Sequence, residues 1–245
     1  MDTKKTVLIT GVAGMLGSNF ADYLLQHYKD EVTVVGIDNL EGGYIENVHQ
    51  KVIFHKCDCA GDLAFLFLKY NPTVVYHFAC YAAEGLSPFI RTFNYNNNLS
   101  ATANIVNYCV NYKCKLVFTS SMSVYGHVKP PFKEIDPCMP IDPYGIAKYA
   151  CEMDIAAAHV QFGLDYAIIR PHNIIGPKQN IWDKYRNVIG IWVRQILNNE
   201  PITIYGDGRQ TRAFSWVGDY FDAFYKLGFG SNTPNKIYNA GGDQY

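Results

Sequence analysis

The chain has 245 residues, enough for one large domain or for one domain and part of a second. Its 49% hydrophobic and 18% charged residues are typical of an ordinary water-soluble globular protein with a sizeable core. Lysine and arginine number 21 against 22 aspartate and glutamate, and the formal net charge of −1 therefore disfavours nucleic acid or an acidic membrane surface as a partner.

The first residues lead into a strand-like segment without a signal-peptide core, and no apolar run approaches the roughly 18 residues needed to span a bilayer. The seven cysteines are scattered and form no pair of metal-binding knuckles. Cys57 and Cys59 would point to opposite faces of a strand, which argues against a shared metal. We therefore expect reduced thiols, no metal site, no membrane association and a cytoplasmic location.

Short β-branched segments alternate with amphipathic stretches over the first two-thirds of the chain. The sequence predicts strands at residues 6–10, 32–37, 52–55, 73–77, 115–119 and 166–170, and helices at 15–28, 63–70, 88–111 and 144–162. Nearly continuous apolar strands separated by helices indicate a parallel sheet covered on both faces. The predicted fold class is therefore α/β, a doubly wound Rossmann sheet whose ligands bind beyond the carboxyl ends of the strands.

After Arg170 the pattern changes to loops with scattered aromatic residues, a predicted helix at 188–198 and a short strand at 202–205. We predict a Rossmann domain over residues 1–170, and over 171–245 a smaller, incomplete substrate-binding region that partly returns to the first domain. Residues 178–212 hold six basic and three acidic side chains, a local excess of +3. This excess can be a solvated surface, but its place beside the strand ends favours a site for an anionic substrate.

Three glycines follow the first strand and open the next helix, the context that a dinucleotide-binding turn requires. Gly11, Gly14 and Gly17 would let the backbone approach a pyrophosphate, and the helix start at Met15 and Leu16 would supply amide donors. Alone, such a stretch could be a tight strand-to-helix turn.

The end of the second strand decides which dinucleotide is expected. Asp38 lies there, where a carboxylate binds the ribose hydroxyls of adenosine and repels a 2′-phosphate. The predicted cofactor is therefore NAD rather than NADP. Asp58, followed by Cys59, is a candidate for the adenine rim and equally a polar residue at a helix start. Phe78 and Ala79 suit a backbone that passes close to the cofactor.

Tyr144 and Lys148 lie one helical turn apart and share a helix face. An ammonium there favours the tyrosinate and lowers a tyrosine pKa that starts near ~10. A lone Tyr-x-x-x-Lys usually marks an exposed helix face, but here it follows the glycine turn and a serine-rich segment around Ser121. The three motifs together predict a phenolate base beside a redox cofactor.

In combination these residues resemble the extended short-chain dehydrogenases that act on nucleotide sugars, and within them the UDP-glucose 4-epimerase-like branch. The resemblance covers essentially the whole chain and rests on TGVAGMLG, GIDNL, HFAC, NNNLSATAN, TSSMSVYG, YGIAK, RPHNIIGP and GDGRQTRAFSWVGD. It implies that Ser121 is the active-site hydroxyl, Tyr144 the base and Lys148 its partner. It implies further cofactor contacts from Asn39, Asn98 and Pro171. The substrate contacts that it implies are Ser121, Ser123, Asn173, Asn187, Val188, Thr203, Tyr205 and Arg212.

The resemblance is less specific for the reaction. Related dehydratases carry an Asp-Glu pair directly after the active-site hydroxyl, and decarboxylases a glutamate at the second of these positions, where this chain has Met122 and Ser123. Elimination needs an acid and a base near C5 and C6, which these two residues cannot supply. We expect an NAD-dependent epimerase that inverts C4 of a UDP-linked sugar through a 4-keto intermediate. A dehydratase, a decarboxylase or a non-catalytic NAD-binding module remains the alternative, and residues 81–87 depart from the usual epimerase sequence.

Two further expectations concern assembly and the end of the chain. The helices at 88–111 and 144–162 carry apolar residues on more than one face, and the resemblance also points to a homodimer seam there. The residues taken to form this seam are Ile105, Val106, Val110, Ile155, Ala156 and Val160.

The chain stops at Tyr245 after a predicted strand at 237–239 and a glycine turn. We expect near-normal NAD binding, weak nucleotide-sugar binding and a mobile segment at 178–212.

Overall fold

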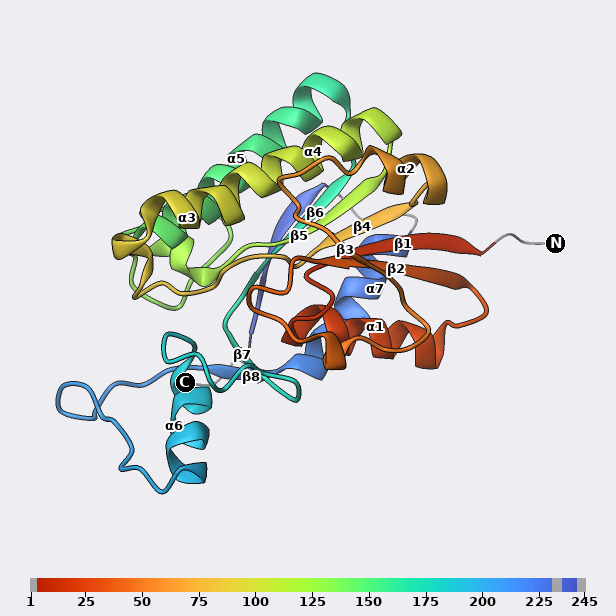
Figure 1. Ribbon diagram of the computed structural model, residues 1–245. Coiled ribbons are helices and arrows are strands. Elements are labelled where there is room, and N and C mark those ends of the chain that lie inside the picture. The colour runs from red at the N-terminus through yellow and green to blue at the C-terminus, as the bar shows by residue number, and fades with distance from the viewer. Residues whose placement is uncertain (1–3, 231–234, 242–245) are drawn as a thin grey trace.

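The computed structural model describes residues 4–230 and 235–241, in which a seven-stranded parallel sheet carries helices on both faces (Figure 1). The strand order is β3-β2-β1-β4-β5-β6-β9. The strands are β1 Lys5–Thr10, β2 Val32–Asp38, β3 Ile53–Lys56, β4 Val74–His77, β5 Lys115–Thr119, β6 Tyr166–Pro171 and β9 Lys236–Ala240. The order reverses between β1 and β4, which is where doubly wound sheets bind ligands. The predicted fold class is confirmed.

Helices cover the sheet in two layers, with α2, α3, α4 and α5 on one face and α1 and α7 on the other (Figure 1). Their bounds are α1 Met15–His27, α2 Ala64–Tyr70, α3 Arg91–Tyr95, α4 Ala101–Tyr112, α5 Pro143–Phe162 and α7 Phe221–Phe229. The single helix predicted at 88–111 is divided, because the π-helix Asn96–Ser100 separates α3 from α4. Such π-turns often occur beside functional sites.

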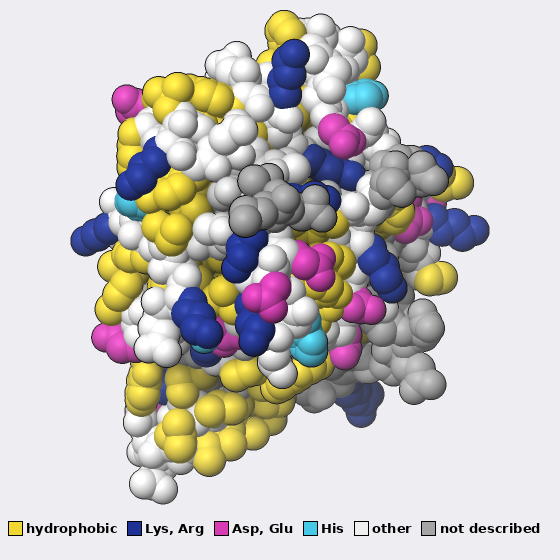
Figure 2. Space-filling view, turned by 90° about the vertical axis from the view of Figure 1, so that its right-hand side faces the viewer, with side chains coloured by type: hydrophobic (Ala, Val, Ile, Leu, Met, Phe, Trp, Pro, Cys, Tyr) yellow, Lys and Arg dark blue, Asp and Glu magenta, His cyan; other side chains and the backbone are white. Residues whose placement is uncertain are grey.

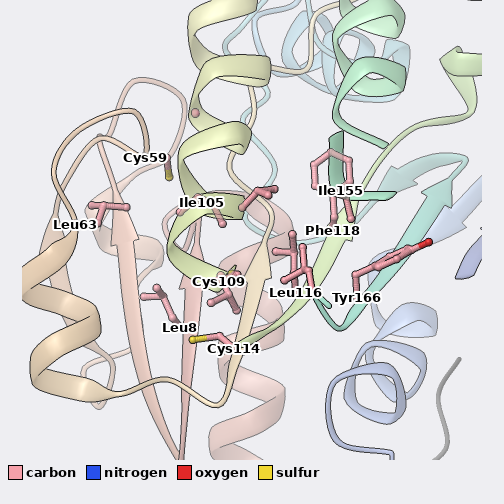
Figure 3. Close-up of a cluster of buried hydrophobic side chains, with 14 of the residues drawn as sticks. Leu8, Cys59, Leu63, Ile105, Cys109, Cys114, Leu116, Phe118, Ile155 and Tyr166 are labelled. Carbon is pink, nitrogen blue, oxygen red and sulfur yellow. The ribbon is translucent and has the colours of Figure 1, made fainter. Parts of the chain in front are cut away.

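Each helix layer has its own apolar core against the sheet. On the α4 and α5 face, Leu8, Leu116 and Phe118 of the strands pack with Ile105 and Ile155 of the helices (Figure 3). Val106 is buried in the same cluster. These three helix residues therefore pack against the sheet and do not form the predicted dimer seam. All seven cysteines are free, which agrees with reduced thiols.

A small second unit lies beyond the carboxyl ends of the strands. β7 (Asn173–Ile175) and β8 (Phe214–Trp216) pair in parallel, and α6 (Val188–Leu197) lies apart from the main sheet (Figure 1). The predicted strand at 202–205 is wrong. Instead, Thr203 donates its backbone N–H to Gln195 Oε1 of α6 at 3.1 Å, so this segment is held by a side chain rather than by a neighbouring strand.

The chain then returns to the Rossmann sheet. Phe224 of α7, a helix that the sequence did not predict, packs edge-on against Phe20 of α1 with 5.6 Å between ring centroids. β9 pairs in parallel with β6, and Ile237 lies beside Ile168. The return that we predicted for part of the C-terminal region is therefore present, while the division at residue 170 stays a prediction. Gly242, in the predicted glycine turn, lies outside the described residues.

The charges on the surface show no strong asymmetry in the view of Figure 2, where basic and acidic side chains are interspersed. Within residues 4–230 and 235–241, none of the helices combines the length and the apolar character needed to cross a bilayer.

Candidate active site

A cavity of about 520 Å³ opens at the carboxyl ends of the strands, where the sheet order reverses. It gathers most of the side chains that the sequence analysis selected, from segments more than 150 residues apart. The predicted residues that line it are Gly11, Gly14, Met15, Leu16, Gly17, Asp38, Asn39, Asp58, Cys59, Phe78, Ala79, Ser121, Ser123, Tyr144, Pro171, Asn173, Asn187 and Arg212.

The glycine turn forms one wall of this cavity and leaves no room for side chains. Gly11 has φ +70°, and a Cβ there would lie 2.7 Å from the backbone nitrogen of Ala79. A Cβ on Gly17 would collide with the carbonyl oxygen of Gly11. Both positions therefore require glycine, since a larger residue would push the turn away from β4 or from the start of α1. The start of α1 opens on the cavity and offers its amide groups to an anionic group there.

Asp38 is held at the end of β2 by the same turn. Its Oδ2 accepts a hydrogen bond from the backbone N–H of Ala13 at 3.0 Å, and its Oδ1 accepts one from Leu40 N–H at 2.8 Å. The side chain is only 8% exposed, and it lines the cavity. A carboxylate fixed in this position suits ribose hydroxyls and disfavours a phosphate, because two negative charges would meet there.

Two serines after β5 place a hydrogen-bonded pair of hydroxyl groups at the cavity. Ser121 Oγ accepts hydrogen bonds from Ser123 Oγ at 2.9 Å and from Ser123 N–H at 3.1 Å. With its acceptor sites used in this way, the Ser121 hydroxyl is free to donate its own proton. The neighbouring Thr119 hydroxyl also lines the cavity and has no hydrogen-bond partner among the described residues, so it can serve a bound molecule.

Tyr144 lies in the first turn of α5, which begins well defined because Asp142 caps it and Pro143 starts it. Asp142 Oδ1 accepts a hydrogen bond from Gly145 N–H at 2.9 Å, and the fixed φ of proline suits the first helical position. The Tyr144 ring is buried at the cavity wall. This start of the helix places the Tyr144 phenol beside the Ser121 hydroxyl at the cavity wall.

Burial holds the pKa of Tyr144 well above the ordinary tyrosine value, with further increases from Cys80 and Glu84. A hydrogen bond from Ser121 and the charge of Arg186 lower this pKa, but do not offset burial. Burial therefore opposes the phenolate that the sequence predicts beside Lys148 and a redox cofactor, and formation of that phenolate stays a prediction. Desolvation of a buried phenolate outweighs an ammonium one turn away.

Lys148 lies behind the cavity wall rather than on it. Its Nζ donates a hydrogen bond to the Thr119 carbonyl at 2.8 Å and lies 5.9 Å from the centre of the Tyr144 ring. The side chain is almost fully buried, so its charge is close to the phenol and poorly screened by solvent.

Known proteins share this arrangement over nearly the whole chain. The family model described as the NAD dependent epimerase/dehydratase family matches residues 7–241. The chain belongs to this family.

Three members of the family show how close the similarity is. A putative UDP-glucose 4-epimerase of Methanocaldococcus jannaschii is 34% identical over 239 residues, covering 96% of this chain and 76% of the relative. The crystal structure of a Thermotoga maritima UDP-glucose 4-epimerase with UDP-glucose superposes with a TM-score of 0.89 at 28% identity, covering 96% of this chain and 76% of that one. A Bacillus anthracis dTDP-glucose 4,6-dehydratase in complex with NAD gives 0.86 at 26% identity, covering 98% and 76%.

Family membership and the glycine turn together show that the chain is an NAD-dependent enzyme that modifies sugars. The residues present fit this cofactor: glycine is required at two places where the backbone closes on the cavity, Asp38 is fixed at the ribose position, and Thr119 has an unpaired hydroxyl. The family includes epimerases and dehydratases, so membership alone does not select the reaction.

Five predicted site residues do not line the cavity: Asn98, Lys148, Val188, Thr203 and Tyr205. Asn98 is buried in the π-helix, where its amide accepts from and donates to the backbone of Tyr81. Thr203 is bonded to Gln195 of α6, and Tyr205 is 75% exposed. The resemblance placed these last two on a strand beside the substrate, and without that strand they do not reach the cavity.

The first part of the segment 178–212 is fixed to the Rossmann unit. Lys178 Nζ forms an ion pair with Asp22 at 2.6 Å, and Tyr44 Oη donates to Asn180 Oδ1 at 3.0 Å. Asn187 caps α6 by accepting from Gly190 N–H at 3.1 Å. The first part of 178–212 therefore packs against the Rossmann unit, while the expected mobility of this segment stays a prediction.

Sequence reasoning missed several residues that the structure brings to the cavity, among them Tyr81, Glu84 and Arg186. Arg186 Nε lies 3.0 Å from Asp183 Oδ2, and its guanidinium stacks over the Tyr81 ring at 4.8 Å. The available signal was the departure of residues 81–87 from the usual epimerase sequence, which marked the segment as distinct without placing any side chain.

Proposed function

We propose that this chain inverts C4 of a UDP-linked sugar through a transient 4-keto intermediate. The observation that carries the proposal is the meeting of the Ser121 and Tyr144 side chains in the cavity that the glycine turn and Asp38 also line. Met122 and Ser123, directly after the active-site hydroxyl, provide no acid or base for elimination at C5 and C6.

In this proposal the cofactor end of the cavity is formed by the turn at Gly11, Gly14 and Gly17, with the amides of Met15 and Leu16 at the pyrophosphate. Asp38 and Asn39 contact the adenosine ribose, and Asp58 and Cys59 the adenine rim. Phe78, Ala79 and Pro171 would line the path to the reacting end, where Tyr144 would meet the nicotinamide ribose. Lys148, which the resemblance assigns to the same ribose, lies behind the cavity wall with Asn98 and would support it from there. Bound NAD supplies two-electron oxidation and re-reduction of C4, together with the positive charge of its oxidised ring.

The chain's own residues handle the proton. Tyr144 Oη, as the phenolate, takes the proton of the sugar 4-hydroxyl and later returns it. Ser121 donates a hydrogen bond to the same oxygen, because its acceptor sites are already used by Ser123. Lys148 favours the phenolate from behind, where its charge is screened little by solvent.

Residues of the second unit would hold the nucleotide diphosphate while the keto sugar rotates to present its opposite face. Asn173 and Asn187 line the cavity from β7 and the start of α6, and Arg212 supplies a positive charge. Val188, Thr203 and Tyr205 do not line the cavity, so the proposal gives them no direct contact with the substrate. Inversion then follows when C4 is reduced again on its opposite face.

The test is incubation of the purified protein with UDP-glucose, followed by chromatography and mass spectrometry of the nucleotide sugars. C4 inversion produces UDP-galactose of unchanged mass. Dehydration produces a sugar that has lost water, and a decarboxylase acting on UDP-glucuronate releases carbon dioxide. The reverse reaction from UDP-galactose checks that both routes reach the same mixture.

The matched control is Tyr144→Phe, which keeps the ring and removes the proton acceptor. A non-catalytic NAD-binding module would leave both sugars unchanged in the parent protein and in this variant alike. That result, obtained with protein shown to carry NAD, would contradict the proposed function.

A further inference from the structure

Glu84 is a cavity carboxylate that plays no part in the mechanism above. Glu84 lies in the segment that follows β4, and this segment supplies Cys80, Tyr81, Ala82 and Glu84 to the cavity wall. Its charge reaches the reacting end, because it is among the groups that raise the pKa of Tyr144. A second carboxylate, Asp142, lies close enough to raise the pKa of Glu84 in turn, after the larger effect of desolvation by the cavity walls.

The segment that carries Glu84 is fixed to the first turn of α5. Ser87 Oγ donates to the Glu84 carbonyl at 2.8 Å and accepts a hydrogen bond from Tyr144 N–H at 3.2 Å. Ser87 is 1% exposed, so solvent does not compete for these bonds. Glu84 and Tyr144 are therefore held in a constant relation by a single buried hydroxyl.

The other end of the segment is fixed as firmly. Asn98 Oδ1 accepts from Tyr81 N–H at 2.8 Å, and Arg186 Nη1 donates to the Ala82 carbonyl at 3.2 Å. Buried Asn94 also ties α3 to the start of α5, since its Nδ2 donates to the Pro143 carbonyl at 2.9 Å. The backbone that carries Glu84 is therefore held at the cavity wall by hydrogen bonds on both sides of this residue.

The nearby cations do not neutralise Glu84 once substrate is bound. Arg186 is committed to Asp183, to the Ala82 carbonyl and to the face of Tyr81. Arg212 lowers the pKa of Glu84, but in the proposed function it is the residue that meets the diphosphate. The sugar would then face a negative charge on the cavity wall, carried by a backbone segment that is hydrogen-bonded to the first turn of α5 through Ser87.

We infer that Glu84 determines the substrate class, by selecting nucleotide sugars with a neutral C6 hydroxymethyl group and rejecting those with a C6 carboxylate. This inference rests on the proposed function. A carboxylate in a confined cavity can accept hydrogen bonds from sugar hydroxyls, whereas a uronate brings a second negative charge into the same space. Repulsion between the Glu84 carboxylate and a uronate carboxylate adds to any selection of the sugar by the shape of the cavity.

The test compares kcat/KM for UDP-glucose and UDP-glucuronate in the parent protein, in Glu84→Gln and in Glu84→Lys. The parent should prefer UDP-glucose. Glu84→Gln should shift the ratio toward UDP-glucuronate by roughly tenfold to a hundredfold, the range expected when one like-charge contact is removed. Glu84→Lys should shift it further, because the charge at the wall is reversed. The control Glu46→Gln removes an exposed carboxylate outside the cavity and should leave the ratio unchanged.

Binding of the two sugars to the NAD-loaded protein, measured by calorimetry, separates this inference from the proposed function. If the parent turns over neither sugar, the proposed function fails, and the ratio of the two dissociation constants still tests Glu84. Equal or better use of UDP-glucuronate by the parent would overturn the inference, as would an unchanged ratio in both Glu84 variants. A parent product that has lost water would also overturn it, because Glu84 would then serve as an acid or base.

Discussion

Glu152 of α5 and Arg170 of β6 form an ion pair with 2.6 Å between Oε2 and Nη2, and both side chains are only 2% exposed. Arg170 Nη1 also donates to Tyr125 Oη at 2.7 Å, and Ser120 Oγ donates to Glu152 Oε1. Ser120 precedes the active-site serine, and Glu152 follows Lys148 by one helical turn. The pair therefore links β6 to the two segments that carry Ser121 and the Tyr144 and Lys148 pair.

Replacing Glu152 by glutamine should lower the free energy of unfolding by about 3–5 kcal/mol, since it leaves the buried Arg170 charge unpaired. Denaturant titration followed by circular dichroism measures this. Lys226→Gln, which breaks an exposed pair with Asp222, should give no resolvable change. Equal effects from the two substitutions would show that the buried pair is not a principal contributor to stability.

Tyr144→Phe should lower kcat for C4 inversion by roughly 10²–10⁴, because the proton acceptor is lost while the ring and the cavity shape remain. Bound NAD should be retained, which absorbance of the released nucleotide after denaturation measures. Tyr149→Phe on the same helix, outside the cavity, is the matched control and should keep its activity. Activity of Tyr144→Phe within a few-fold of the parent would remove Tyr144 from the mechanism.

The rate of C4 oxidation in a single turnover should rise with pH, because burial raises the pKa of Tyr144 and the phenolate is the reactive form. Ser121→Ala removes the hydrogen bond that lowers this pKa, so the rising limb of the pH profile should move to higher pH. Stopped-flow measurement of cofactor reduction by UDP-glucose gives the profile. Ser100→Ala, an exposed serine of the π-helix, should leave it in place, and a shift of similar size there would contradict the assignment.

His77 should make the protein less stable in acid. Its ring is fully buried between Thr10 Oγ1 at 2.7 Å and Thr102 Oγ1 at 3.0 Å, and burial lowers its pKa from 6.5 to about 3. Below pH 6.5 the unfolded chain therefore binds a proton that the folded protein does not, so stability falls from pH 6.5 toward about 3.

The measurement for His77 is the free energy of unfolding at several pH values across this window. His77→Asn should be less stable at pH 7 but should lose less on acidification, because the titrating group is gone. His127→Asn, which alters an exposed histidine, should keep the parent's pH dependence. A parallel curve for His77→Asn would show that this histidine does not set the acid sensitivity.

We expect the chain to form a homodimer through α5. Ile146, Met153 and Val160 recur every seven residues along this helix and are 42%, 53% and 83% exposed, a continuous apolar stripe on its outer side. Sedimentation at micromolar concentration should give a dimer, and Met153→Arg with Val160→Arg should give a monomer of unchanged fold. A monomeric parent protein would contradict this expectation, as would a doubly substituted protein that stays dimeric.

The residues that we first assigned to this seam show where sequence patterns reach their limit. Ile105, Val106 and Ile155 were selected because they add apolar surface to their helices, yet all three pack against the sheet. Two covered faces of a helix look alike in sequence, since apolar side chains bury equally well against a strand or a second subunit. Only the position of the sheet distinguishes the two cases.

Local motifs determined the parts of the site that depend on short-range geometry. The need for glycine at position 17 follows from steric contact with Gly11 in the same turn, and the relation of Tyr144 to Lys148 follows from one helical turn. The parallel sheet could also be predicted from the sequence, because strands covered on both faces must be apolar throughout. None of these features requires knowledge of distant contacts.

Tertiary structure decided what distant segments bring together. Burial raises the pKa of Tyr144, Ser87 joins the Glu84 backbone to the Tyr144 backbone across more than 50 residues, and Gln195 holds Thr203 where a strand was predicted. Desolvation and hydrogen bonds between remote segments depend on the packed arrangement of the whole chain, which no local spacing encodes. The sequence by itself therefore determined the glycine turn and the spacing of Tyr144 and Lys148, and the folded chain decided which distant side chains, Glu84 among them, line the cavity.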